Sequence, residues 1–228
     1  MNFDMKATAS MVEGGKSLTP GIHKAKFEGI DVDVFEIKNG PKAGTSSNVM
    51  NVNLTIDEYG PYSQAFWEPT SNERSSGMYG DNPSQVEQFM VLLRQIFDAV
   101  DPTIGEKIDS GEIVLSGSFV QIVKAAKKLL APKTGEEVEV KLIPDNKGYC
   151  HIPSFPAKCT KNGALGIQTR VIGHNLTLSS SEVKKIEAAK NAKPTDMATK
   201  KEAKELLDDL GIDMKPSNGL DDLPFGDD

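Results

Sequence analysis

Hydrophobic and polar residues alternate strictly between positions 49 and 57, and this is the clearest pattern in the chain. The even positions from 50 to 56 hold Met, Val, Leu and Ile, whereas the odd positions from 51 to 57 hold Asn, Asn, Thr and Asp. A period of two predicts a strand with one buried face. Residues 58–61, with the sequence EYGP, favour a tight turn, so residues 62–68 are expected to return as the second strand of an antiparallel hairpin.

Similar but weaker patterns predict further strands and one amphipathic helix. We expect strands over 21–35, 137–143, 147–155 and 166–172, with a bend or bulge in the first of them at Gly29. Apolar residues at helical spacing predict a helix over 83–100, with Asn82 as its N-cap and Pro83 in its first position. The pattern is ambiguous from 111 to 130. It allows a strand at 113–115 and, over 119–130, either a helix or a strand that runs into one.

These elements predict a fold that is mainly β with helical insertions. Short strands with one interposed helix favour an OB-fold-like antiparallel barrel. A capping box at 179–182 predicts the start of a helix, and a second helix is expected over 196–210. We therefore divide the chain into four parts, which are a flexible N-terminal arm (1–17), an OB-like nucleic-acid-binding domain (18–178), a helical segment (179–210) and a disordered acidic tail (211–228).

Charge is distributed very unevenly. Residues 205–228 hold eight acidic residues and one basic residue, so they account for the whole formal net charge of −7. The rest of the chain is balanced, and the overall negative charge therefore does not argue against a nucleic-acid partner. An acidic end of this kind is typical of an interaction tail, although a tail that only improves solubility has the same composition.

The tail also carries a short apolar motif. Residues 219–228 read GLDDLPFGDD, which places Leu-Pro-Phe among aspartates. This string resembles the C-terminal tip of bacterial and phage single-stranded-DNA-binding proteins, which recruit replication, recombination and repair enzymes through it. In the bacterial proteins the phenylalanine is normally the last residue, whereas here three residues follow it. The resemblance implies that the partner-docking residues are Asp221, Asp222, Leu223, Pro224 and Phe225.

Binding of single-stranded DNA without sequence preference requires basic residues for phosphates and aromatic rings for bases. The expected nucleic-acid-binding residues are Lys24, Lys26, Tyr62, Phe66, Trp67, Arg74, Tyr79, Lys124, Lys127, Lys128 and Tyr149. Phe66 and Trp67 point to opposite faces of their strand, so one of them is expected to be buried. We expect Tyr62, Tyr79 and Tyr149 to be the exposed stacking residues.

Other functions are less well supported by the residues. Cys150, His151, Cys159 and His174 lack the spacing of paired zinc ligands, and no cofactor motif or catalytic constellation is recognisable. Two cysteines, no secretory pattern and no long apolar run favour a cytoplasmic protein without a membrane segment. The sequence predicts a non-enzymatic protein that binds single-stranded DNA. It leaves open whether the protein forms homo-oligomers. The alternatives are an adaptor or virion-associated structural protein that binds no nucleic acid, and a nuclease or metal-dependent enzyme.

Overall fold

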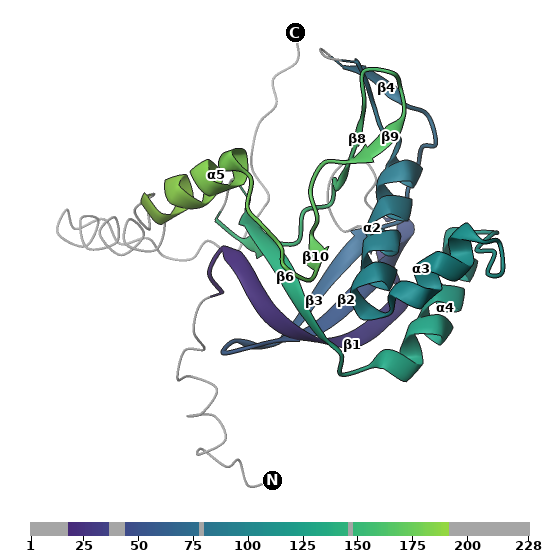
Figure 1. The fold of residues 1–228 in the computed structure, drawn as a ribbon, viewed down its shortest axis with the longest axis horizontal. Helices are drawn as coiled ribbons and strands as arrows, with labels where there is room; N and C mark the ends of the chain where they lie inside the picture. The colour runs from purple at the N-terminus through teal and green to yellow at the C-terminus, as the bar shows by residue number, and fades with distance from the viewer. Residues whose placement is uncertain (1–17, 37–43, 78–79, 146–147, 192–228) are drawn as a thin grey trace, which may run out of the picture. The chain divides into compact units, whose positions relative to one another are not determined.

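The computed structural model describes residues 18–36, 44–77, 80–145 and 148–191. The chain divides into two compact units, residues 1–187 and 188–228. The arm at 1–17, the helix expected over 196–210 and the acidic tail all lie outside the described residues. Within residues 18–187 the fold is mainly β, with a curled antiparallel sheet that forms half a barrel and a few helices (Figure 1).

The sheet has the strand order β10-β6-β1-β2-β3, and β7 extends it by pairing with β6. Its strands are β1 (Gly21–Glu36), β2 (Ser46–Ile56), β3 (Gly60–Trp67), β6 (Glu137–Pro144), β7 (Cys150–His151) and β10 (Ile172–Gly173). Strand β1 pairs with β6 through its first residues and with β2 over most of its length. The register with β2 shifts between Phe27 and Gly29, which confirms the bulge expected there and lets the long strand bend.

Two small hairpins stand outside this sheet. They pair β4 (Ser75–Gly77) with β5 (Gly80–Asn82), and β8 (Ala157–Cys159) with β9 (Leu165–Ile167). The strand expected over 147–155 is therefore reduced to β7, and the strand expected over 166–172 is replaced by β9 and β10, separated by irregular chain. No strand forms at 113–115.

The helices are α2 (Gln85–Val100), α3 (Pro102–Asp109), α4 (Phe119–Leu130), a short 3₁₀ turn η1 (Ala131–Lys133) and α5 (Ser180–Asn191). The expected N-cap of α2 was wrong. Ser84, not Asn82, caps the helix, because its hydroxyl accepts from the Glu87 N–H while the Glu87 carboxylate accepts from the Ser84 N–H. Asp101 ends α2 and caps α3, a helix that the sequence did not predict. The capping box at 179–182 is confirmed.

The hydrophobic core lies between the inner face of the sheet and helices α2 and α4. From the sheet it receives Phe27, Ile30 and the alternating apolar residues of β2, and from α2 it receives Leu93, Ile96 and Phe97. The strict alternation in β2 thus buries one face and leaves Asn51, Asn53 and Thr55 on the other. Within the described residues no helix combines the length and the apolar character needed to cross a bilayer.

Candidate nucleic-acid interface

The outer face of β1, β2 and β3 is covered by a ladder of polar side chains. The Asn51 amide donates to Asp33 at 2.6 Å, and the Asn53 amide donates to Asp31 at 3.1 Å. The ladder continues across the sheet, because Ser63 on β3 donates to the Asn53 carbonyl oxygen at 2.7 Å. Thr55 likewise donates to Glu28 at 2.8 Å, so Glu28, Asp31 and Asp33 are all hydrogen-bonded within the sheet and the side chains form a fixed polar surface.

At one end of this face two aromatic rings meet. Trp67 lies beside Val49 in the sheet register, and Phe35 approaches it from β1. Their ring centroids are 5.4 Å apart with an interplanar angle of 82°, an edge-to-face arrangement. Trp67 is 50% exposed and Phe35 is 51% exposed, so both rings remain accessible. Phe35 was not among the residues predicted to bind nucleic acid, although the alternation of side chains along β1 places it on the same face as Asp31 and Asp33.

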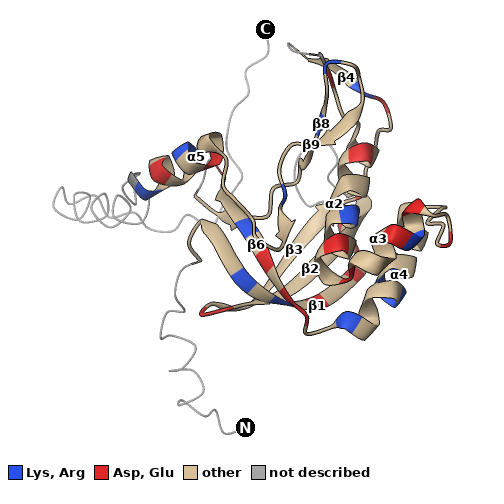
Figure 2. Ribbon diagram, viewed as in Figure 1, with Lys and Arg blue, Asp and Glu red and all other residues tan. Residues whose placement is uncertain are grey.

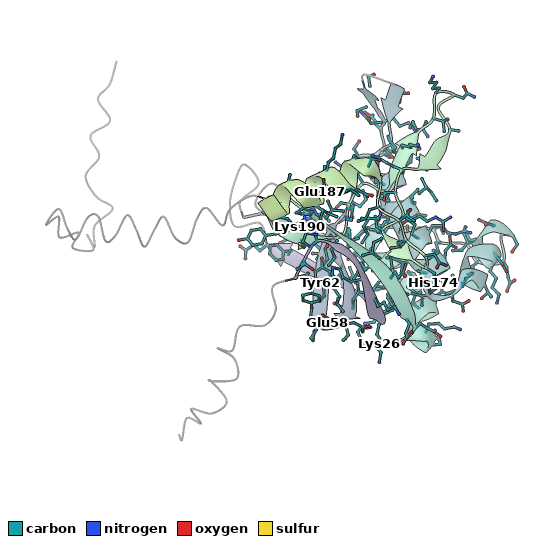
Figure 3. All side chains as sticks on the ribbon, turned by 60° about the vertical axis from the view of Figure 1, so that its left-hand side comes forward. Lys26, Glu58, Tyr62, His174, Glu187 and Lys190 are labelled. Atoms are coloured by element: carbon teal, nitrogen blue, oxygen red, sulfur yellow. The ribbon has the colours of Figure 1, made fainter. Side chains whose placement is uncertain are left out.

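Tyr62 and Phe66 face the opposite way, toward the core. Phe66 is buried, which agrees with the expectation that either it or Trp67 would be. Tyr62 was expected to be an exposed stacking residue, and this was wrong because it lies half-buried on the inner face of β3 (Figure 3). Its hydroxyl donates to Gln64 Oε1 at 2.6 Å, and burial raises the pKa of Tyr62 to about 12.

The lysines expected to bind phosphates are exposed but do not form one cluster with the rings. Lys24 and Lys26 lie on the outer face of β1, opposite Glu139 and Glu137 of β6. Three more lie on α4, where Figure 2 shows basic residues in blue; these are Lys124, Lys127 and Lys128. The Lys127 ammonium forms an ion pair with Asp31, which brings α4 next to the polar ladder.

Arg74 has a structural role in this arrangement. Its guanidinium forms a bidentate contact with Glu87 and donates to the Gly163 carbonyl oxygen at 2.6 Å. It therefore joins the chain before β4, the start of α2 and the β8–β9 hairpin. Its hydrogen bond with Glu87 raises the pKa of Arg74 and lowers the pKa of Glu87 to about 2. Arg74 is thus not brought to the outer face of the sheet.

The remaining aromatic candidates are separate from the Phe35–Trp67 pair. Tyr149 is 72% exposed, and Tyr79 lies outside the described residues. Phe155 is also exposed, at 67%. Phe155 and Trp67 both line a groove of about 300 Å³ between the end of β3, the start of α2 and residues 154–155. Strand β3, which is the free edge of the sheet, forms one wall of this groove.

Two of the four residues considered as metal ligands, Cys150 and His174, have other contacts. The Cys150 thiol donates to the Leu18 carbonyl oxygen, and burial raises its pKa. His174 Nε2 lies 2.9 Å from the Ala99 carbonyl oxygen. Over the ranges that the structure describes, no three His, Cys, Asp or Glu side chains are grouped so that they could hold a metal ion. Comparison with protein-family models, with curated proteins and with solved structures gives no match for this chain.

Proposed function

We propose that this protein binds single-stranded DNA along the outer face of β1, β2 and β3, without catalysing a reaction. The observation that carries this proposal is the exposed pair Phe35–Trp67 at the end of that face. Adjacent apolar rings that remain exposed to water are typical of an interaction site. Each base stacked on such a ring contributes about 1–3 kcal/mol to binding.

The arrangement of the strands supports the same proposal. The half-barrel has three consecutive strands at one side, β1-β2-β3, and the next long strand of the chain, β6, returns to pair with β1 after the helices. This is compatible with an OB-fold-like barrel that is open between β3 and β10. OB-folds bind oligonucleotides on the face of their second and third strands and on the adjoining loops. In this chain that face carries Asn51, Asn53, Ser63 and Trp67.

The acidic tail completes the proposal. We infer that Asp221, Asp222, Leu223, Pro224 and Phe225 recruit replication or recombination enzymes, because an apolar tip among carboxylates can enter an apolar pocket with a basic rim. Deletion of residues 211–228 should preserve binding of oligo-dT and abolish capture of those enzymes on DNA-coated beads. Capture that persists without the tail would refute its proposed role.

A gel-shift titration with oligo-dT at two salt concentrations tests DNA binding. Affinity should fall as salt rises, because phosphate contacts release counterions.

A second candidate function is an adaptor or structural protein whose body binds no nucleic acid. It is favoured by one observation, which is that Glu139 and Glu137 stand opposite the lysines of β1 and offset their charge. Absence of oligo-dT binding at low salt would favour this second function over DNA binding.

A further inference from the structure

Strand β3 forms one edge of the sheet, and part of its backbone is unpaired. The Glu68 N–H donates to the Asn48 carbonyl oxygen at 2.9 Å. Together with the register, this bond shows which residues of β3 direct their backbone groups toward β2. Even-numbered residues of β3 therefore bond to β2, whereas the N–H and C=O groups of odd-numbered residues point away from it. Within the described part of the chain, no backbone or side-chain group bonds to Ala65 or Trp67 on that free side.

Two prolines delimit this open stretch. Pro61 and Pro69 occupy odd positions, so the nitrogens that cannot donate lie on the free side. Proline is accepted at an edge strand in this orientation and prevents pairing with another strand. Only the residues between the prolines keep free N–H groups. The edge is thus protected at both ends and open over residues 63–67, enough for a short added strand.

The groove lies directly beside this stretch. Its walls include Ala65 and Trp67 of β3, Phe89 and Leu92 of α2, and Phe155. A free strand edge next to an apolar groove supplies the two parts of recognition by strand addition. Main-chain hydrogen bonds provide affinity, and a pocket for one of the alternating side chains provides specificity.

Charge distinguishes between possible occupants. The described residues that line the groove include one carboxylate, Glu68, and no lysine, arginine or histidine. The Glu68 carboxylate, which accepts a hydrogen bond from the Asn48 amide at 2.6 Å, has no cationic neighbour among these lining residues. It disfavours a phosphate backbone inside the groove and the same edge of a second copy, and it favours a basic segment.

We propose that the free edge of β3 at residues 63–67 binds an extended basic peptide segment of another protein, with one apolar side chain in the groove between Trp67 and Phe155. This binding goes beyond the proposed function, because it uses the folded body and not the acidic tail. The peptide would add as a further strand beside β3, next to the end of the proposed DNA-binding face.

Three capped heptapeptides test the proposal on the full-length protein. One alternates Lys and Val, one alternates Glu and Val, and one is the Lys–Val peptide with N-methyl groups on alternate backbone nitrogens. Binding is measured by calorimetry and by the fluorescence of Trp67, the only tryptophan in the chain. The Lys–Val peptide should bind saturably below about 1 mM, and the other two at least ~10-fold more weakly.

Two substitutions at one position provide the matched control. Ala65→Pro removes a free N–H that the native ladder does not use, so the protein should remain folded by circular dichroism. Ala65→Thr keeps this N–H and favours a strand. We expect the Lys–Val peptide to lose at least ~10-fold in affinity for A65P and to bind A65T as it binds the unmodified protein.

Three results would overturn the proposal. They are absence of saturable Lys–Val binding at 1 mM peptide, equal binding of the N-methylated peptide, and equal binding of the peptide to A65P and A65T. Loss of oligo-dT binding in A65P but not in A65T, with no peptide binding, would assign the edge to nucleic acid. Failure of the unmodified protein to bind oligo-dT concerns only the proposed function, so the two failures are distinguishable.

Discussion

Gln88 on α2 forms both of its side-chain hydrogen bonds with the backbone of a single residue, Ala157. The Ala157 N–H donates to Gln88 Oε1 at 2.8 Å, and Gln88 Nε2 donates to the Ala157 carbonyl oxygen at 3.1 Å. Both residues are buried. The primary amide thus replaces the partner that a neighbouring strand would otherwise supply.

Two other glutamines make equivalent contacts along the same segment. Gln64 on β3 binds both backbone groups of Ile152, at 2.6 and 2.8 Å. Gln95 on α2 donates to the Thr169 carbonyl oxygen at 3.0 Å and accepts from the Val171 N–H at 2.7 Å. Residues 152–171 contain little regular structure, and these three amides hold them against the core.

We expect Gln88→Met to lower the free energy of unfolding by about 2–4 kcal/mol. The substitution conserves apolar volume but leaves a buried N–H and a buried C=O without partners, and each such group costs about 1–3 kcal/mol. Urea unfolding of the full-length protein measures the change.

Gln168→Met is the matched control for that measurement, because Gln168 is exposed and lies in the same segment. We expect a change within about 0.5 kcal/mol for the control. Equal destabilisation by the two substitutions would show that the amide contacts of Gln88 are not what holds the segment.

Lys141 and Glu182 form a buried ion pair between β6 and the start of α5. The Lys141 ammonium lies 3.0 Å from Glu182 Oε2 and donates to the Thr169 hydroxyl at 2.7 Å. Although burial opposes it, the hydrogen bonds from Ser179 and Lys141 lower the pKa of Glu182. The glutamate of the α5 capping box is therefore also the counter-ion of a buried lysine.

We expect Lys141→Met to destabilise the protein by about 3–5 kcal/mol, because it leaves a largely buried carboxylate without its partner. The double substitution Lys141→Met and Glu182→Gln should recover part of this loss. A double-mutant cycle by urea unfolding measures the coupling, and strictly additive effects would contradict it.

Tyr62 should ionise late in an alkaline titration. Because its pKa is raised to about 12 from 10.0, the neutral phenol stabilises the fold below pH 10, and this contribution is lost as pH rises from 10 to 12. Ultraviolet difference spectra should show a tyrosine that titrates near 12 and is absent in Tyr62→Phe. A step near pH 12 that persists in Tyr62→Phe would show that the assignment to Tyr62 is wrong.

Glu87 should remain charged at a lower pH than an ordinary glutamate. Its pKa is lowered to about 2 from 4.5 by the hydrogen bond from Arg74, so its contribution is present above pH 4.5 and is lost as pH falls toward 2. Unfolding measured across this range should show a smaller pH dependence for Glu87→Gln than for the unmodified protein. Indistinguishable pH profiles would contradict this role.

The elements that were predictable from the sequence are those with local causes. The alternation in residues 49–57 predicted β2, and the glycine at 29 predicted the bulge of β1. Both causes, burial of one face and the conformational freedom of glycine, act within a few residues. The N-cap of α2 was misplaced by two residues, since both Asn82 and Ser84 are favourable caps and Glu87 decides between them through the capping box.

The parts that were not predictable depend on distant contacts. Residues 147–155 have a strand-like composition, but the backbone of Ile152 bonds to the side chain of Gln64 and not to a strand. Tyr62 was misplaced because its exposure is decided by residues 150–152, far along the chain. Phe35 is exposed because β6 pairs only with the first part of β1, which the local sequence does not reveal.

A fluorescence titration with oligo-dT tests whether single-stranded DNA binds the outer face of the sheet, because Trp67 is the only tryptophan in the chain and lies on that face. We expect saturable quenching that weakens as salt is raised, and a loss of about 1–3 kcal/mol in binding free energy for Trp67→Ala measured by gel shift. Val114→Ser, at an exposed apolar position outside the sheet, should bind as the unmodified protein does. Unchanged Trp67 fluorescence at saturating oligo-dT, or equal affinity of Trp67→Ala, would contradict the account.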